Sequence, residues 1–256
     1  MKVLVSNDDG IHARGLENLC SALNSIGLEV LVCAPDRERS AASHALTMYS
    51  PLRCHELDKH GLEATRVWTV DGTPADCVKV ALELLLKDSL PDFVVSGINR
   101  GPNLGTDIMY SGTVAAAAEG CLMGIRSMAI SCTAKRSPDY LAASGFIKDH
   151  FLSIMGNGIP AGTMVNVNVP PDAQKEQGNY VFRYTRAGTM KYSEAFDVRN
   201  DPRGRQYIWM SGEPMDIDTD EDYDTVTVRR GICSVTPLRF DFTNTEYLDK
   251  LRGQGK

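Results

Sequence analysis

Two adjacent carboxylates stand where the first apolar segment of the chain ends. Asp8 and Asp9 follow the run Lys2–Ser6 and precede Gly10, which favours a turn. Like charges this close repel each other, and a bound cation relieves the repulsion. Carboxylate oxygens suit Mg²⁺, Mn²⁺ or Ca²⁺. The pair therefore indicates a metal site or a simple turn in which an Asp caps the next helix, and its place in the fold favours the metal site.

Two neutral side chains add oxygen ligands to this hypothesis. Ser40 follows the second apolar run, and Asn99 follows a third. Taken alone, Ser40 would be interpreted as a helix cap and Asn99 as a turn residue in the left-handed conformation. Together they would complete an all-oxygen metal site around Asp8 and Asp9.

A candidate phosphate site lies further along the chain. Ser111, Gly112 and Thr113 precede an Ala-rich run that predicts a helix over 113–123. Free N–H groups at a helix start, with two hydroxyls beside them, suit a phosphate, although simple capping explains the same residues. Asn103, on the preceding loop, is a further candidate for a substrate contact.

The alternation of short apolar runs with helical periodicity positions these residues. Up to about residue 171 it predicts a doubly wound, mainly parallel α/β sheet of the Rossmann-like type. Strands are expected at 2–6, 29–34, 92–96, 128–131 and 164–169, and helices at 16–26, 74–87, 113–123 and 140–155. Ligands bind outside the carboxyl ends of such strands. Asp8-Asp9, the 36–44 loop and the 97–112 loop are therefore expected at one edge.

The chain changes character after this region. Strands are expected at 180–185, 206–210, 225–229 and 233–238, followed by a short helix opened by Thr243-x-x-Glu246. Segments 45–57 and 65–70 are expected to be extended but outside the apolar core of the sheet. We therefore expect a catalytic core over 1–175 and a hairpin-rich extension with a C-terminal helix over 176–256.

Composition excludes some classes of protein. The 256 residues carry a net charge of -6, which argues against binding DNA or RNA polymers through a basic surface. The seven cysteines are an odd number without a C-x-x-C pair, typical of a reducing cytoplasm. No run is apolar enough to predict a membrane span or a signal peptide.

The motifs resemble the SurE family of survival-protein nucleotidases over nearly the whole chain. Several long motifs in the right order are more specific than any one of them. They are Ser6-Asn7-Asp8-Asp9-Gly10, Ala34-Pro35-Asp36-Arg37-Glu38-Arg39-Ser40, Gly72-Thr73-Pro74-Ala75-Asp76-Cys77, Ser96-Gly97-Ile98-Asn99-Arg100-Gly101-Pro102-Asn103-Leu104-Gly105, Tyr110-Ser111-Gly112-Thr113-Val114, Asn166-Val167-Asn168-Val169-Pro170 and Ser234-Val235-Thr236-Pro237-Leu238.

This resemblance implies a phosphatase that depends on one Mg²⁺ or Mn²⁺ per subunit. Its substrates would be nucleoside 5′- and 3′-monophosphates, and in some members short polyphosphate. The family's metal ligands map onto Asp8, Asp9, Ser40 and Asn99. Subunit exchange of the hairpin and C-terminal segment implies a homodimer or homotetramer. Arg239 stands where some members have His, so chemistry or assembly that depends on that His would differ here.

The sequence leaves the attacking group open. A water can attack phosphorus, or Asp8 or Asp9 can attack directly and form an aspartyl-phosphate. A haloacid-dehalogenase-type phosphatase is a weak rival, because that superfamily uses Asp-x-Asp rather than Asp-Asp-Gly. The alternative from another class is a nucleotide-binding regulatory module without turnover.

Overall fold

One nine-stranded sheet organises the chain in the computed structural model, which describes residues 1–58, 61–134, 139–156, 158–193, 196–210, 212–215 and 217–253. The strand order is β10-β15-β7-β6-β5-β1-β2-β4-β3. Its central six strands are parallel, as the alternation of strands and helices predicted. They are β7 (Thr163–Val169), β6 (Arg126–Cys132), β5 (Phe93–Arg100), β1 (Lys2–Ser6), β2 (Glu29–Pro35) and β4 (Arg66–Val70).

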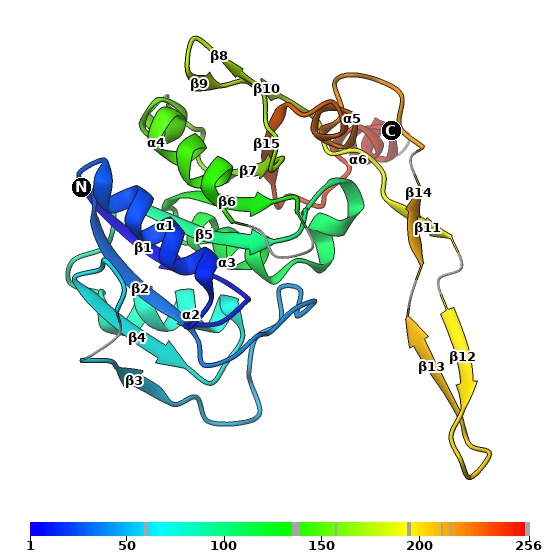
Figure 1. Cartoon of the computed structure of the whole chain (residues 1–256), viewed down its shortest axis with the longest axis horizontal. Coiled ribbons are helices and arrows are strands. Elements are labelled where there is room, and N and C mark those ends of the chain that lie inside the picture. Colours follow the sequence, from blue (N-terminus) through cyan, green and yellow to red (C-terminus); the bar gives the residue numbers. More distant parts are fainter. Residues whose placement is uncertain are drawn as a thin grey trace.

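Helices cover both faces of the sheet (Figure 1). On one face, α1 (Arg14–Ser25) packs against α4 (Leu141–Gly156) over a large apolar cluster that includes Phe146 and Phe151. On the other face, α2 (Pro74–Val80), its π-helical continuation Ala81–Leu85 and α3 (Gly112–Leu122) cover Leu4 and Val94. Burial on both faces explains the continuous apolar runs of the strands. The doubly wound fold is confirmed.

The start of α2 shows how local sequence fixes an element. The Thr73 hydroxyl accepts a hydrogen bond from the Asp76 N–H at 3.1 Å, and the Asp76 carboxylate accepts one from the Thr73 N–H at 2.9 Å. This reciprocal capping box, with Pro74 at the first helical position, confirms the predicted helix start.

Two segments near the sheet differ from the sequence prediction. β4 does not lie outside the core: Val67 and Val70 are fully buried, and the strand pairs in parallel with β2. β5 does not end at Ser96 but continues to Arg100 after an irregularity between Ser96 and Asn99. Pairing with neighbouring strands decided both, and that pairing has no local sequence signal.

A third difference lies near the C-terminus. Residues 225–229, predicted as a strand, form a helix, α5 (Asp224–Arg229). The β-branched residues there favour a strand. An acidic first residue and a basic last residue complement the helix dipole, and Val226 is buried. Tertiary packing outweighed the weak local propensity.

The sheet continues past the predicted boundary at residue 175. β10 (Phe182–Tyr184) pairs in parallel with β15 (Cys233–Arg239), and β15 pairs antiparallel with β7. β3 (Cys54–Glu56) forms the opposite edge by antiparallel pairing with β4. β8 (Lys175–Glu176) and β9 (Asn179–Tyr180) form a small separate hairpin. The chain after residue 175 therefore supplies two strands of the main sheet.

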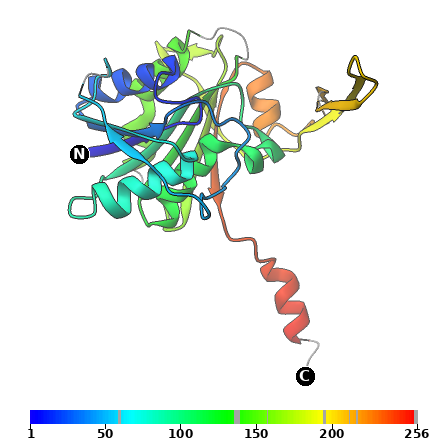
Figure 2. The ribbon, with the colours of Figure 1, turned by 90° about the horizontal axis from the view of Figure 1, so that it is seen from below.

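Two arms project from this body. One is a long hairpin, in which β11 (Lys191–Ser193) pairs with β14 (Glu213–Met215), and β12 (Phe196–Asn200) pairs with β13 (Gln206–Met210) (Figure 1). The other is α6 (Thr245–Gly253), which extends away from the body and buries no residue (Figure 2). Its N-terminus is capped by Asn244, whose side chain accepts from the Tyr247 N–H at 2.9 Å, rather than by Thr243 as predicted. Within the described residues, no helix is long and apolar enough to cross a membrane.

Candidate metal and phosphate site

The turn after β1 presents the two carboxylates. The Asn7 side chain donates to the Gly10 carbonyl at 2.9 Å, and the Ile11 N–H donates to the Pro35 carbonyl at 2.8 Å. Gly10 has φ of +96°, and a Cβ there would lie 2.8 Å from the carbonyl carbon of Arg37. A side chain is therefore excluded, and the turn is pressed against the loop that follows β2.

That second loop brings Ser40 to the turn. The Arg39 N–H donates to the Asp8 carbonyl at 2.7 Å, which fixes the residue next to Ser40. The Ser40 hydroxyl donates to the Glu38 carboxylate at 2.7 Å, so its oxygen retains lone pairs for another partner.

The end of β5 brings Asn99 to the same place. The Arg100 N–H donates to Asp9 Oδ2 at 3.2 Å, across 91 residues of sequence. The Asn99 amide nitrogen donates to the Gly101 carbonyl at 2.9 Å, which leaves the amide oxygen available. The Arg100 guanidinium lies 3.6 Å from Glu38, so this strand end and the loop carrying Ser40 also contact each other.

The start of α3 closes the site from the other side. The Thr113 hydroxyl donates to Asp8 Oδ1. A Cβ on Gly112 would lie 2.9 Å from the Asp8 Cβ, so the helix start rests directly against this carboxylate. The Ser111 hydroxyl accepts from the Val114 N–H at 3.1 Å and so caps the helix. Capping occupies Ser111 as an acceptor, but its proton remains free for a ligand.

Burial makes the charge of this pair costly. Removal from water is the main cause that raises the pKa of Asp8 to about 6; the Thr113 hydrogen bond opposes this rise, and the charge of Asp9 adds to it. Burial also raises the pKa of Asp9. A cation beside the pair would remove this cost.

The donor set fits a hard divalent cation. Asp8, Asp9, Ser40 and Asn99 offer only oxygen, and each keeps lone pairs that its hydrogen bonds do not use. Among the described residues, no three or more His, Cys, Asp or Glu side chains group so as to hold a metal. The two neutral oxygens are therefore needed beside the carboxylates. The neighbouring Asn7 Oδ1 is buried without a hydrogen-bond partner, which marks a polar environment next to the pair.

Asn103 has a different environment from the other candidates. It is buried, its N–H donates to Asn168 Oδ1 at 2.8 Å, and its amide nitrogen donates to the Ser131 hydroxyl at 2.8 Å. Its carbonyl accepts from Asn166 and Asn168 at 2.8 and 2.9 Å. These bonds anchor the 101–105 loop on β6 and β7, and the side chain of Asn103 keeps its amide oxygen and one amide proton for a substrate.

Sequence reasoning missed one cluster that supports the site. Glu119, buried on α3, accepts from His44 at 2.9 Å and from Lys79 at 3.3 Å. These bonds tie the loop that carries Ser40 to α2 and α3. The signal was present in the sequence, since Glu119 is the single charged residue in the run 113–123.

The joint between the body and the long hairpin was also missed. Asp224 is fully buried and accepts from the N–H groups of Gly105, Gly188 and Thr225 at 2.8–3.0 Å. Asp218 accepts from Thr189 N–H and the Thr225 hydroxyl, each at 2.7 Å. The acidic run 213–224 therefore includes two carboxylates that order neighbouring segments.

Comparison with known proteins identifies the relatives of this chain. A family model described as survival protein SurE matches residues 3–194. Relatives named 5′-nucleotidase SurE in Pelotomaculum thermopropionicum and Desulforudis audaxviator are 48% and 46% identical, each over 98% of this chain and over 94% and 96% of their own. The crystal structure of the SurE protein from Aquifex aeolicus superposes with a TM-score of 0.83 at 36% identity, covering 100% of both chains.

Proposed function

The chain belongs to the SurE family, and on that premise we propose that it is a metal-dependent nucleotidase, which hydrolyses nucleoside 5′- and 3′-monophosphates to nucleoside and phosphate. One observation carries the proposal. The Arg100 N–H donates to the Asp9 carboxylate, the Thr113 hydroxyl donates to the Asp8 carboxylate, and the Arg39 N–H donates to the Asp8 backbone carbonyl. Three distant segments therefore converge on Asp8 and Asp9.

The metal would be held by Asp8, Asp9, Ser40 and Asn99. A bound Mg²⁺ or Mn²⁺, one per subunit, supplies Lewis-acid polarisation of a phosphate and lowers the pKa of a bound water. The protein holds the ligands in place: Thr113 orients Asp8, and the Arg100 N–H orients Asp9.

The start of α3 would receive the phosphate. This helix start lies directly against Asp8, since a Cβ on Gly112 would come within 2.9 Å of the Asp8 Cβ, and Ser111 caps it. Partial positive charge at a helix start stabilises the negative charge that develops on phosphoryl oxygens during transfer. The amide oxygen of Asn103 could accept a hydrogen bond from a substrate hydroxyl.

Two routes of attack are consistent with these positions. In one, Asp8 or Asp9 orients a water and accepts its proton. In the other, one of these carboxylates attacks phosphorus, the bond from phosphorus to the nucleoside oxygen breaks, and water then hydrolyses the aspartyl-phosphate. Rapid quenching of a single turnover separates the routes, because only the covalent route forms an acylphosphate on Asp8 or Asp9 that can be trapped.

The test is phosphate release from a panel of nucleoside 5′- and 3′-monophosphates, with Mg²⁺ or Mn²⁺ and then with EDTA. We expect release that EDTA abolishes and that Asp9→Asn reduces by about 10³-fold, a typical loss when an essential charged group is removed. Full activity in EDTA or in Asp9→Asn contradicts the proposal. Tripolyphosphate in the same panel tests whether the site also accepts short polyphosphate.

A nucleotide-binding module without turnover is the alternative. It predicts that the protein binds nucleoside monophosphates in calorimetry but releases no phosphate at any metal concentration. The buried, paired carboxylates favour the enzyme, because binding alone does not require two adjacent charges beside a phosphate.

We also propose that the protein acts as a homodimer or homotetramer in the cytoplasm. Ile208, Trp209 and Met210 are exposed on the long hairpin, and an apolar surface of this kind is typical of a contact between proteins. The seven cysteines are free, as expected in a reducing compartment. Light scattering after size exclusion tests assembly, and a monomer at all concentrations contradicts it. Cell fractionation tests the compartment.

A further inference from the structure

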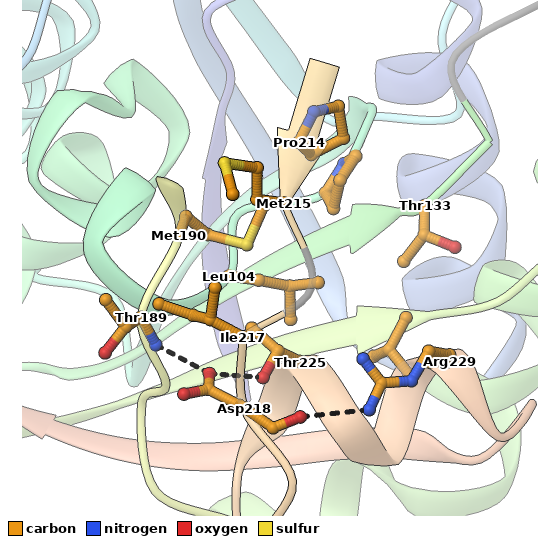
Figure 3. A pocket seen from close by; sticks show the side chains of 12 residues that line it. Leu104, Thr133, Thr189, Met190, Pro214, Met215, Ile217, Asp218, Thr225 and Arg229 are labelled. Carbon is orange, nitrogen blue, oxygen red and sulfur yellow. Dashed lines mark hydrogen bonds between the residues drawn. The ribbon is translucent and has the colours of Figure 1, made fainter. Parts of the chain in front are cut away.

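A cavity of about 390 Å³ lies between the body and the base of the long hairpin. Its walls come from four places: the loop after β5, the end of β6, the hairpin base and α5 (Figure 3). Apolar side chains dominate, chiefly Leu104, Met190, Met215 and Ile217, while Thr133 supplies a hydroxyl. An apolar cavity with a few polar groups is the usual form of a small-molecule site.

The cavity adjoins the carboxylate pair through the chain itself. Arg100 donates to Asp9, and Pro102, two residues further on, lines the cavity. Two residues of chain span at most about 7 Å, so Pro102 lies within that distance of Arg100. Cys132, whose carbonyl accepts from the Gly101 N–H at 2.9 Å, directly precedes Thr133. A mononucleotide with its phosphate at Asp9 is long enough for its base to reach this cavity.

The cavity walls are held in place by buried hydrogen bonds. Asp224 ties Gly105, on the loop after β5, to Gly188 in the segment leading to the hairpin. Asp218 ties Thr189 to Thr225 on α5. The Thr106 hydroxyl donates to the Met190 carbonyl at 3.0 Å and accepts from the Met190 N–H at 3.1 Å. The cavity is therefore preformed rather than a gap between loose segments, and little ordering is needed when a ligand enters.

We propose that this cavity binds the base of the nucleotide substrate, an inference that rests on the proposed nucleotidase function. The thioethers of Met190 and Met215 contact the faces of the base, because sulfur packs favourably against aromatic rings. The Thr133 hydroxyl, which makes no hydrogen bond to other described residues, meets a polar group on the edge of the base. Base and phosphate are thus recognised by different elements.

The experiment compares adenosine 5′-monophosphate with ribose 5-phosphate, which has the same phosphate and sugar but no base. Full-length wild type, M190A/M215A and Thr133→Val are assayed with Mg²⁺. We expect the methionine variant to raise KM for the nucleotide by about tenfold, the scale of lost apolar contacts in a pocket, with ribose 5-phosphate unchanged. Thr133→Val should raise KM for the nucleotide by a smaller factor.

A matched control removes an exposed apolar side chain at the far end of α3. Leu122→Ala should leave the KM for both substrates unchanged.

Two outcomes would overturn the proposal. In one, the cavity variants change the KM for both substrates equally; in the other, wild type has the same KM for both substrates. If wild type hydrolyses neither substrate, the nucleotidase function fails, and the cavity is then judged by calorimetry with adenosine alone. The proposal is also overturned if wild type and M190A/M215A bind adenosine with equal affinity, or if neither binds it.

Thr133→Val keeps the test usable if the double variant unfolds, because it nearly conserves the volume of the side chain. Thermal unfolding of each variant identifies that case. The folded Thr133→Val protein is then assayed with several nucleotides whose bases carry different edge groups. If its KM equals that of wild type for every one of them, the contact assigned to Thr133 is contradicted.

Discussion

The carboxylate site and the long hairpin differ in what holds them in place. At the site, Asp8 and Thr113 are buried and bonded to each other across 105 residues of sequence. On the hairpin, β12 and β13 bond mainly to each other, and Trp209 is 61% exposed. The body of the protein therefore fixes the site by itself, whereas the hairpin keeps an apolar surface that only another surface can cover.

The first prediction breaks the site without disturbing the body. Asp8→Asn should lower kcat/KM by at least about 10³-fold, equivalent to about 4 kcal/mol of transition-state stabilisation. Without metal, the variant should not unfold at a lower temperature than wild type, because burial raises the pKa of Asp8 and makes its charged form costly. Phosphate release and calorimetry measure the two effects. Asp88→Asn, an exposed carboxylate, is the control. An Asp8→Asn variant with wild-type activity would remove the carboxylate pair from the mechanism.

The second prediction displaces the carboxylate rather than removing it. Gly112→Ala places a Cβ 2.9 Å from the Asp8 Cβ, so the Asp8 side chain must shift. A misplaced catalytic group costs about 10²-fold in kcat. Gly156→Ala is the control, because a Cβ there meets no atom within 4 Å. Similar activity in the two variants would show that the contact between the helix start and Asp8 does not matter.

The third prediction tests the joint between the two regions. The Asp224 carboxylate accepts hydrogen bonds from three N–H groups. In Asp224→Asn, one carboxylate oxygen is replaced by an NH₂ group, which cannot accept a hydrogen bond from an N–H. We expect the free energy of unfolding to fall by about 2 kcal/mol, the cost of an unsatisfied buried group. Chemical denaturation measures it. A loss below about 0.5 kcal/mol would show that the joint adds little to stability.

The fourth prediction concerns the loop that carries Ser40. The hydrogen bond from His44 holds the pKa of Glu119 below its ordinary value of 4.5. The Glu119 carboxyl therefore binds a proton more readily in the unfolded chain than in the folded one. The folded protein gains stability from this difference above pH 4.5 and loses it as the pH falls through the pKa of Glu119 in the folded state. Glu119→Gln should remove this contribution to the free energy of unfolding, on the order of 1 kcal/mol. Denaturation curves recorded between pH 5 and 3 measure it. An unchanged pH dependence in Glu119→Gln would contradict it.

The fifth prediction has the smallest effect on the body. Trp209→Ser should change the free energy of unfolding of a single chain by less than about 0.5 kcal/mol, because the side chain is exposed there. If the hairpin joins subunits, the same change lowers the molar mass in light scattering. Loss of a folded body in Trp209→Ser would erase the contrast between the two regions.

Much of the fold was predictable because local signals were strong. The apolar run before Asp8, the helical spacing after it and the capping box at Thr73 each agree with the observed element. Position 226 shows the limit: Val226 favours a strand, yet lies buried in α5. β4 was placed outside the core because pairing between strands distant in sequence leaves no local trace.

For the candidate site, the sequence predicted which segments meet at one edge of the sheet, and metal binding itself stays a prediction. The four oxygen-bearing residues were selected from their positions after apolar runs and from the SurE resemblance, and the structure brings their segments together. Asn103 shows what sequence could not provide. Its polar side chain suggested a substrate contact, but the structure occupies most of its hydrogen-bonding groups with β6 and β7.

The sequence by itself determined the order of strands and helices up to about residue 169 and the edge at which Asp8 and Asp9 lie, because periodicity, caps and turns act over a few residues. Only the tertiary structure decided which groups touch that pair. Thr113, Arg39 and Arg100 reach it through packing between segments far apart in the chain. It also decided that Asp218 and Asp224, two charges in an acidic run, lie where the base of the hairpin meets the sheet. Burial and long-range hydrogen bonding, which no local pattern encodes, made that difference.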